Sequence, residues 1–295
     1  MFKVFCELVC PMCLKPARAN RMVLWVALAA TALLAMAAMV FGGCQPKGEP
    51  APDNQLEAVR QRGYLVIGCK YDSPPFGYLD TDGHVKGFEI DLGRLLADKV
   101  LGDPNAVKFV QVNTSTRIAA LDAKHVDLVL ATMTITEERK EKVAFSPTYY
   151  TAAQAVMVKA DSAYRRVADL DGKPVAFVLG ATSEARLKKN IPQAKLLGFK
   201  ATTEAFSAFN AGRAQAFSTD DSILYGFVSE YCGVKLLEDR LSEEPYGMAF
   251  RKDDSAKPLV AAVSSALEQL LAAGEVAQLK AKWMRTNPPD TCAKP

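Results

Sequence analysis

The chain has 295 residues, of which 49% are hydrophobic and 23% are charged, and its formal net charge is +3. This length allows up to two ordinary domains, and the composition is typical of a globular protein rather than a disordered one. The sequence contains no basic stripe with interleaved aromatic residues, so a nucleic-acid-binding function is not expected.

The N-terminal segment predicts membrane targeting. Residues 23–41 carry no charge, Lys15, Arg18 and Arg21 precede them, and two glycines lead from them to Cys44. This is the order of a lipoprotein signal peptide, although the apolar stretch is also long enough to be a permanent membrane anchor. We favour the lipoprotein interpretation, because the stretch ends at small residues and a cysteine, and a polar linker follows.

This interpretation makes residues 1–43 the signal peptide, Cys44 the lipidated residue and 44–55 a tether linker. Phe41 departs from the aliphatic residue that is usual in such a signal, and Met12 is an alternative translation start. With either a lipid anchor or a permanent helix, the sequence predicts an extracytoplasmic domain attached to a membrane.

Three later cysteines have different expected roles. Cys69 ends an apolar strand and is expected to be a buried free thiol. Cys232 and Cys292 are a possible disulfide in the oxidising exterior, and closing that long loop would stabilise the fold by ~4 kcal/mol. Sequence alone does not establish that the two residues lie close together.

Strand and helix patterns alternate along residues 56–151. In chain order we expect a helix at 56–62, a strand at 64–69, a proline turn at 72–76, a hairpin turn at 80–83, a helix from 88, a strand at 107–112, a helix at 117–123, a strand at 127–131 and a helix from 137. Phe88, Leu92 and Leu96 share one helical stripe that faces a core.

A second set of elements follows. It comprises strands at 154–158 and 175–179, helices at 184–189 and 201–211, a strand at 214–218, a helix at 222–231, a strand at 246–250 and one or two helices at 258–283. Strands that alternate with helices indicate parallel-rich α/β sheets.

Residues 131–139 are the first candidate binding site. They follow a buried apolar strand, and Thr136 occupies the expected N-cap position of the next helix. Hydroxyl groups, free backbone N–H groups and the guanidinium of Arg139 therefore meet at one junction, which suits a small carboxylate. The alternative is an ordinary capped helix with a solvated arginine.

Residues 87–97, GFEIDLGRLLA, resemble the signature of the family 3 extracellular solute-binding proteins. These are periplasmic or lipid-anchored receptors that deliver polar amino acids to ABC importers. Glu89 and Asp91 belong to this signature, and we interpret them as partners of the helix dipole rather than as ligands.

The resemblance covers residues 56–283 and implies an α/β, two-lobed, type II periplasmic-binding-protein fold. Each lobe is expected to hold a parallel-rich sheet flanked by helices, and two hinge crossings join them. The implied boundaries are 56–151 for the first part of lobe 1, 152–245 for lobe 2, and 246–295 for the return to lobe 1 with the C-terminal helices and tail.

The resemblance also implies a ligand site between the lobes. Thr134 and Arg139 would hold the α-carboxylate from lobe 1, and Thr132 is a further ligand-binding residue of the same junction. Thr182 and Ser183 would offer donors from the turn at a strand-to-helix junction of lobe 2.

Asp220 matches the acid that binds the α-ammonium group, although the adjacent Asp221 is an alternative and either residue is also a candidate N-cap. Phe76 is expected to form a wall of the site or to be part of the core.

Lys70 and Arg117 are the expected specificity residues. By resemblance, Arg117 grips a side-chain carboxylate in aspartate- and glutamate-binding relatives, and Lys70 is a cation where glutamine-, histidine- and basic-residue-binding relatives carry an acid. We therefore expect glutamate or aspartate as the ligand, with cysteine or glutamine as alternatives within the family. In the opposing interpretation Lys70 points to solvent and Arg117 braces its loop.

An enzyme on the same fold, such as a dehydratase, is the second functional class. His84 and His125 are the only histidines, and the sequence contains no HExxH, GxSxG or P-loop pattern. We therefore expect a monomeric binding protein without cofactor or metal, whose partners are a free L-amino acid, permease subunits and the membrane.

Overall fold

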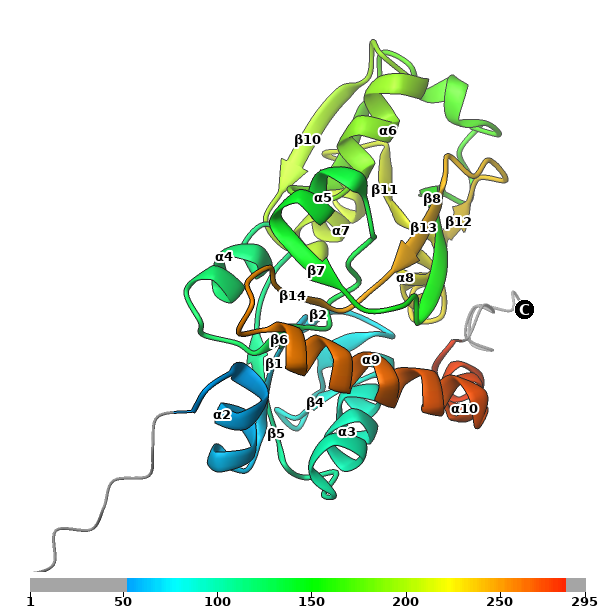
Figure 1. Cartoon of the computed structure of the whole chain (residues 1–295). Coiled ribbons are helices and arrows are strands. Elements are labelled where there is room, and N and C mark those ends of the chain that lie inside the picture. Colours follow the sequence, from blue (N-terminus) through cyan, green and yellow to red (C-terminus); the bar gives the residue numbers. More distant parts are fainter. Residues whose placement is uncertain (1–51, 285–295) are drawn as a thin grey trace, which may run out of the picture. The chain divides into compact units, whose positions relative to one another are not determined.

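The computed structural model describes residues 52–284. The predicted signal peptide, the lipidation residue Cys44 and the predicted disulfide partner Cys292 lie outside this part of the chain. Within it, two separate mixed sheets form, and helices flank each of them (Figure 1).

The first sheet has the strand order β5-β1-β6-β14-β7. The strands β1, β5 and β6 are parallel, whereas β14 is antiparallel to both β6 and β7. The late strand β14 lies between β6 and β7, so the chain returns to its first sheet after completing the second. The bounds are β1 Leu65–Cys69, β5 Val107–Gln111, β6 Leu128–Val129, β7 Val143–Phe145 and β14 Ala249–Arg251.

The helices of this lobe include the two C-terminal ones, which pack against early elements of the chain. The contacts join α9 to α2 and α3, and α10 to α3 and α9, as Figure 1 shows in orange, blue and cyan. Gly274, at a backbone φ of +74°, follows the C-cap residue of α9 and is the N-cap of α10, so the predicted segment 258–283 is two helices. The bounds are α2 Gln55–Arg62, α3 Phe88–Leu101, α4 Arg117–Asp122, α5 Glu137–Lys142, α9 Lys257–Ala272 and α10 Glu275–Trp283.

The second sheet has the order β10-β9-β11-β8-β12, and β13 pairs with β8 as well. Its parallel part is β10-β9-β11, and β8 runs antiparallel to β11, β12 and β13. The strand bounds are β8 Tyr150–Lys159, β9 Pro174–Val178, β10 Lys195–Phe199, β11 Ala216–Asp220, β12 Val234–Leu236 and β13 Glu243–Tyr246. The helices are η1 Val167–Leu170, α6 Ser183–Asn190, α7 Thr202–Asn210 and α8 Asp221–Val228.

Two paired strands carry the chain between the sheets. Strand β8 leaves the first lobe and β13 returns to it, and Tyr150 pairs with Tyr246 at their shared end. An isolated bridge joins Tyr246 to Thr134, and the N–H of Tyr149 donates to the carbonyl of Tyr246 at 3.0 Å. The connection is therefore hydrogen-bonded to the predicted site junction at 131–139.

An aromatic cluster lies where these connections enter the first lobe. The rings of Phe76, Phe88, Tyr149, Tyr150 and Tyr246 contact one another, with centroids 5.2–6.2 Å apart. Such edge-to-face and offset contacts stabilise a core beyond simple burial. Four of these side chains are at most 1% exposed, and only Tyr150 is half-buried.

The two-lobed α/β fold predicted from the sequence is confirmed, and Cys69 is a buried free thiol as expected. The α3 stripe also faces the core, since Phe88, Leu92 and Leu96 are fully buried. The description of parallel-rich sheets needs a correction, because antiparallel strands take part in both sheets. The helix expected at 222–231 ends earlier, at Val228.

Three further strands form a small antiparallel sheet, β2-β3-β4, around the predicted hairpin turn. Their bounds are β2 Asp72–Ser73, β3 Gly77–Leu79 and β4 Val85–Lys86. Within residues 52–284 no single helix has the length and apolar character to cross a bilayer. Helices α9 and α10 reach that length and apolar character only when they are taken together, and the chain bends by 75° between them.

Candidate functional site

A polar cleft lies between the two lobes, at the ends of strands from both sheets. Its volume of about 20 Å³ is close to the space that one water molecule occupies. An amino acid therefore requires the lobes to part. The lining residues are Lys70, Thr114, Arg117, Thr132, Thr134, Arg139, Val178, Ala181, Thr182, Thr219, Asp220 and Ile223.

Arg139 projects from the first turn of α5 and reaches both lobes. The Thr136 side chain caps this helix by accepting a hydrogen bond from the N–H of Arg139, as the sequence predicts. One guanidinium nitrogen donates to the Thr134 carbonyl at 2.8 Å, and the other donates to the Gly180 carbonyl of lobe 2 at 3.0 Å. Burial lowers the pKa of Arg139, and the charge of Asp220 opposes that shift.

Thr132 lies in the same junction in a strained conformation. Its φ of +44° is in the left-handed region, which is unusual for a β-branched residue. The Thr132 N–H donates to Oε1 of Glu89 at 2.6 Å, and its carbonyl accepts a hydrogen bond from Arg117 at 3.1 Å. Side chains from two other elements therefore fix this backbone unit.

Both predicted specificity residues line the cleft. Lys70 is 4% exposed and Arg117 is 2% exposed, so the expectation of a solvent-facing Lys70 does not hold. Arg117 does brace its surroundings, because it donates to the carbonyl groups of Ala131 at 2.6 Å and Thr132 at 3.1 Å.

Both side chains are cations in a buried site. Burial lowers the pKa of Lys70, and the negative charges of Asp72 and Glu89 oppose that shift. Burial and the charge of Arg139 lower the pKa of Arg117, and Glu89 opposes that shift as well. Lys70 forms no hydrogen bond or salt bridge with any other side chain of the described segment.

Asp220 ends β11 and is 7% exposed. Burial raises the pKa of its carboxyl group to about 7, although a hydrogen bond from the Tyr246 hydroxyl opposes the shift. Asp221, the alternative, does not line the cleft; it accepts from the backbone N–H of Ala153 and Ser222. The structure thus brings Asp220, not Asp221, together with the other predicted residues.

Two predicted residues do not reach the cleft surface. Phe76 is fully buried in the aromatic cluster. Ser183 is 1% exposed, and its hydroxyl donates to Gln154 at 3.3 Å. Its neighbour Thr182 does line the cleft and donates to Glu244 at 3.0 Å.

Comparison with known proteins gives this geometry a context. Residues 65–286 match the family of bacterial extracellular solute-binding proteins, family 3. The chain belongs to this family.

The glutamine-binding protein of Geobacillus stearothermophilus is 37% identical and aligns with 78% of this chain and 93% of its own length. The glutamate/aspartate import solute-binding protein of Escherichia coli is 28% identical over 87% of this chain and 88% of its own. Among solved structures, an ancestral arginine-binding protein bound to glutamine has a TM-score of 0.70 and 38% identity, covering 75% of this chain and 98% of that one.

In this member of family 3, the described conformation has the lobes in direct contact at the cleft margins. The N–H of Thr202 in lobe 2 donates to Asp72 at 2.6 Å, and its hydroxyl lies 3.0 Å from that of Ser73. A Cβ atom on Gly226 would approach the Pro74 carbonyl to 2.4 Å, so only glycine permits this approach of α8 to the proline turn.

The sequence reasoning missed several residues of this family 3 cleft. Thr114 and Thr219 line it beside predicted residues. Their positions close in sequence to Arg117 and Asp220 could have identified them as candidates. Glu89 and Tyr246 were missed as supports of the lining, because a fully buried acid and a tyrosine in a hinge strand carry no pattern of their own.

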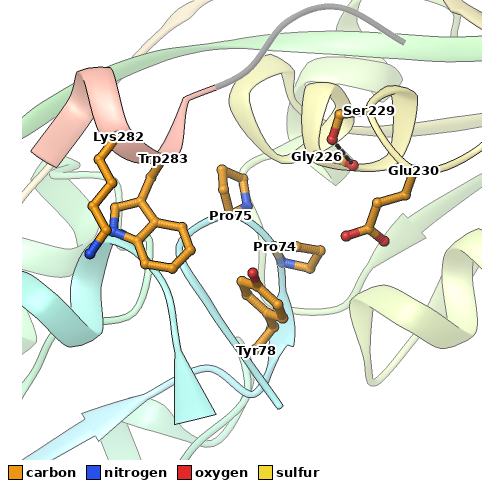
Figure 2. A pocket seen from close by; sticks show the side chains of 8 residues that line it. All are labelled: Pro74, Pro75, Tyr78, Gly226, Ser229, Glu230, Lys282 and Trp283. Carbon is orange, nitrogen blue, oxygen red and sulfur yellow. Dashed lines mark hydrogen bonds between the residues drawn. The ribbon is translucent and has the colours of Figure 1, made fainter. Parts of the chain in front are cut away.

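A second hollow, of about 440 Å³, lies outside the cleft at the rim of the lobes (Figure 2). The proline turn, Tyr78 and the end of α10 line one side, and α8 lines the other. Within the described range no group of histidine, cysteine and acidic side chains is arranged to hold a metal ion.

Proposed function

We propose that this protein is an extracytoplasmic receptor that delivers a polar L-amino acid to an ABC importer, and that its preferred ligand is glutamate or aspartate. Arg139 would bind the α-carboxylate and Asp220 the α-ammonium group. Because these two residues lie on different lobes, one zwitterion would hold the lobes together, which is the usual mechanism of closure around a ligand.

The charge of the cleft is the observation that supports an acidic ligand. Three cations line it, Lys70, Arg117 and Arg139, against the single acid Asp220. The backbone charges of a zwitterion would occupy Arg139 and Asp220. Two cations remain for the ligand side chain, and a buried cation without a partner is costly.

Glutamine is the second candidate, and the relatives favour it. The 37% identical relative is named a glutamine-binding protein, and glutamine has nearly the shape of glutamate. The negative charge of Glu89 behind the cleft acts on both Lys70 and Arg117, which reduces the net positive charge that a neutral side chain would meet.

Isothermal titration of the purified protein with L-glutamate, L-aspartate, L-glutamine and L-cysteine tests this proposal. Tighter binding of glutamate or aspartate than of glutamine would support the acidic preference. Tighter binding of glutamine or cysteine would keep the receptor function and refute that preference. Failure of every L-amino acid to bind would refute the receptor function itself, and conversion of a bound ligand, checked by mass spectrometry, would indicate an enzyme.

The predicted lipid anchor at Cys44 is part of the same proposal. Mass spectrometry of the membrane-extracted protein would find a diacylated N-terminal cysteine if it is correct. An intact leader would instead indicate a permanent anchor helix.

A further inference from the structure

Glu89 is the most unusual charged residue of the first lobe. It is fully buried in the first turn of α3, although acidic side chains are almost never fully buried without partners. Its Oε1 accepts hydrogen bonds from the Tyr149 hydroxyl and from the N–H of Thr132, the latter at 2.6 Å. Its Oε2 has no hydrogen-bond partner among the residues that the structure describes. A role as a simple helix-dipole partner does not require any of these contacts.

Glu89 and Arg117 hold the same residue from two sides. Glu89 binds the N–H of Thr132, and Arg117 binds its carbonyl. Thr132 keeps a left-handed φ of +44°, a conformation that persists only where surrounding contacts enforce it. Because Thr132 lines the cleft, these contacts fix part of the ligand site.

Burial raises the pKa of Glu89, whereas the hydrogen bonds from Tyr149 and Thr132 and the charges of Lys70 and Arg117 lower it and so favour its ionised form. The charge of Glu89 in turn acts on both specificity cations. Its carboxylate is not on the cleft surface, whereas Lys70 and Arg117 are. In a buried site of low effective dielectric, such a charge acts on its neighbours across several ångströms.

We infer that Glu89 is a specificity-determining residue that does not touch the ligand: its carboxylate offsets one of the two cleft cations and holds Thr132 in its binding conformation. This inference rests on the proposed function and extends it. The charge of Glu89 sets how strongly the cleft distinguishes an anionic side chain from its neutral amide.

The substitution Glu89→Gln separates charge from shape, because the amide oxygen still accepts from Thr132. Without the negative charge the cleft becomes more positive, so the ratio of the glutamine Kd to the glutamate Kd should rise on the order of tenfold. Titration calorimetry with both ligands measures this ratio. An unchanged ratio with retained binding would overturn the inference.

Two further variants keep the test decisive. Glu89→Asp retains the charge but shortens the reach to Thr132, so it should weaken both ligands equally and leave their ratio unchanged. Asp127→Asn is the matched control, because Asp127 is another buried acid of this lobe that accepts a backbone N–H, that of Val66 at 2.7 Å, and it does not line the cleft. A control that changes the ratio as much as Glu89→Gln would also overturn the inference. If wild-type protein bound no L-amino acid, the proposed function would fail instead.

An independent observation concerns the rim hollow of Figure 2. Trp283 forms part of its wall, and the indole N–H donates to Asp91 at 2.8 Å. The opposite wall is α8 with Glu230, and Cys232 follows two residues later. Cys232 is disulfide-bonded, whereas Cys69, the other cysteine in residues 52–284, is free. The bonded partner of Cys232 therefore lies outside that range.

We propose that Cys292 is the partner of Cys232. The chain reaches the hollow at Trp283, and the nine residues from there to Cys292 can span up to about 30 Å. This bond would connect the segment that follows α10 of lobe 1 to the segment that follows α8 of lobe 2.

Peptide mapping of the full chain without reduction tests the pairing directly, and a bond from Cys232 to any other cysteine would refute it.

Discussion

The two ends of the cleft are built differently. At the end proposed to bind the ligand backbone, Arg139 comes from lobe 1 and Asp220 from lobe 2, and Arg139 already contacts the Gly180 carbonyl of lobe 2. At the end proposed to read the side chain, Lys70 and Arg117 both come from lobe 1. A ligand would therefore couple the lobes through groups that every amino acid shares, whereas one lobe alone would select the side chain.

The largest effect expected from this difference is that of Arg139→Ala. Losing two charge-assisted hydrogen bonds, each contributing ~1.5–3 kcal/mol, should weaken every amino-acid ligand by at least roughly 100-fold. Titration calorimetry against glutamate and glutamine measures the loss. Lys142→Ala is the control, since this exposed cation lies on the same helix and pairs with Glu138. Tight binding by the Arg139 variant would remove Arg139 from the carboxylate site.

A selective effect is expected at the other end. Lys70→Met keeps most of the side-chain length but removes its charge, so glutamate affinity should fall by about 100-fold. Glutamine affinity should change by only a few-fold, on the order of one hydrogen bond. Competition binding with both ligands measures the split, with Lys108→Met on exposed β5 as the control. An equal loss of affinity for both ligands would show that Lys70 does not distinguish their side chains.

The pH dependence of binding tests the backbone end again. Asp220 has a pKa of about 7 in the ligand-free protein, and only its ionised form suits an ammonium group. Affinity should therefore fall by about tenfold between pH 8 and pH 6. The groups that act on it are Tyr246, Glu244, Lys70 and Asp221.

Stability should show the opposite trend. A carboxyl group whose pKa is raised on folding binds more protons in the folded state than in the unfolded state between pH 4 and 7. Its contribution to the free energy of unfolding is therefore present at low pH and lost as pH rises through about 7. Thermal melts and titrations at the same pH values check both signs. Asp220→Asn should abolish the pH dependence of each, and an unchanged profile would assign it to another group.

The sequence predicted the elements whose patterns are local. The junction at 131–139 was predictable because an apolar strand, a threonine cap and an arginine follow one another within a few residues. Strand β10 was not predicted, since its edge position leaves none of its residues buried, and both Lys195 and Gly198 are exposed. Strand β13 contains Pro245 and the fully buried Glu244, so nothing local marks it as a strand.

The site shows the same division between local and long-range information. Lys70, Arg117 and Asp220 were found through a family resemblance, and their meeting in one cleft depends on strand order that the chain does not display locally. Phe76 was placed near the ligand because a proline turn precedes it, but contacts with Tyr150 and Tyr246, remote in sequence, bury it. The contacts of Glu89 could not be predicted, because its partners Thr132 and Tyr149 lie 43 and 60 residues away.

The smallest expected effect compares two adjacent residues of lobe 2. Thr182 lines the cleft, and its hydroxyl is bound to Glu244, whereas Ser183 is bound to Gln154 beneath the surface. Thr182→Ala should weaken glutamate by about fivefold, the value of one ordinary hydrogen bond. Ser183→Ala should change the melting temperature without changing affinity, because its hydroxyl cannot reach a ligand without breaking a buried bond. If Ser183→Ala weakened binding more than Thr182→Ala did, lobe 2 would contact the ligand through a different face of this turn. The end of the cleft that binds the ligand backbone would then include an additional hydrogen-bond donor from lobe 2.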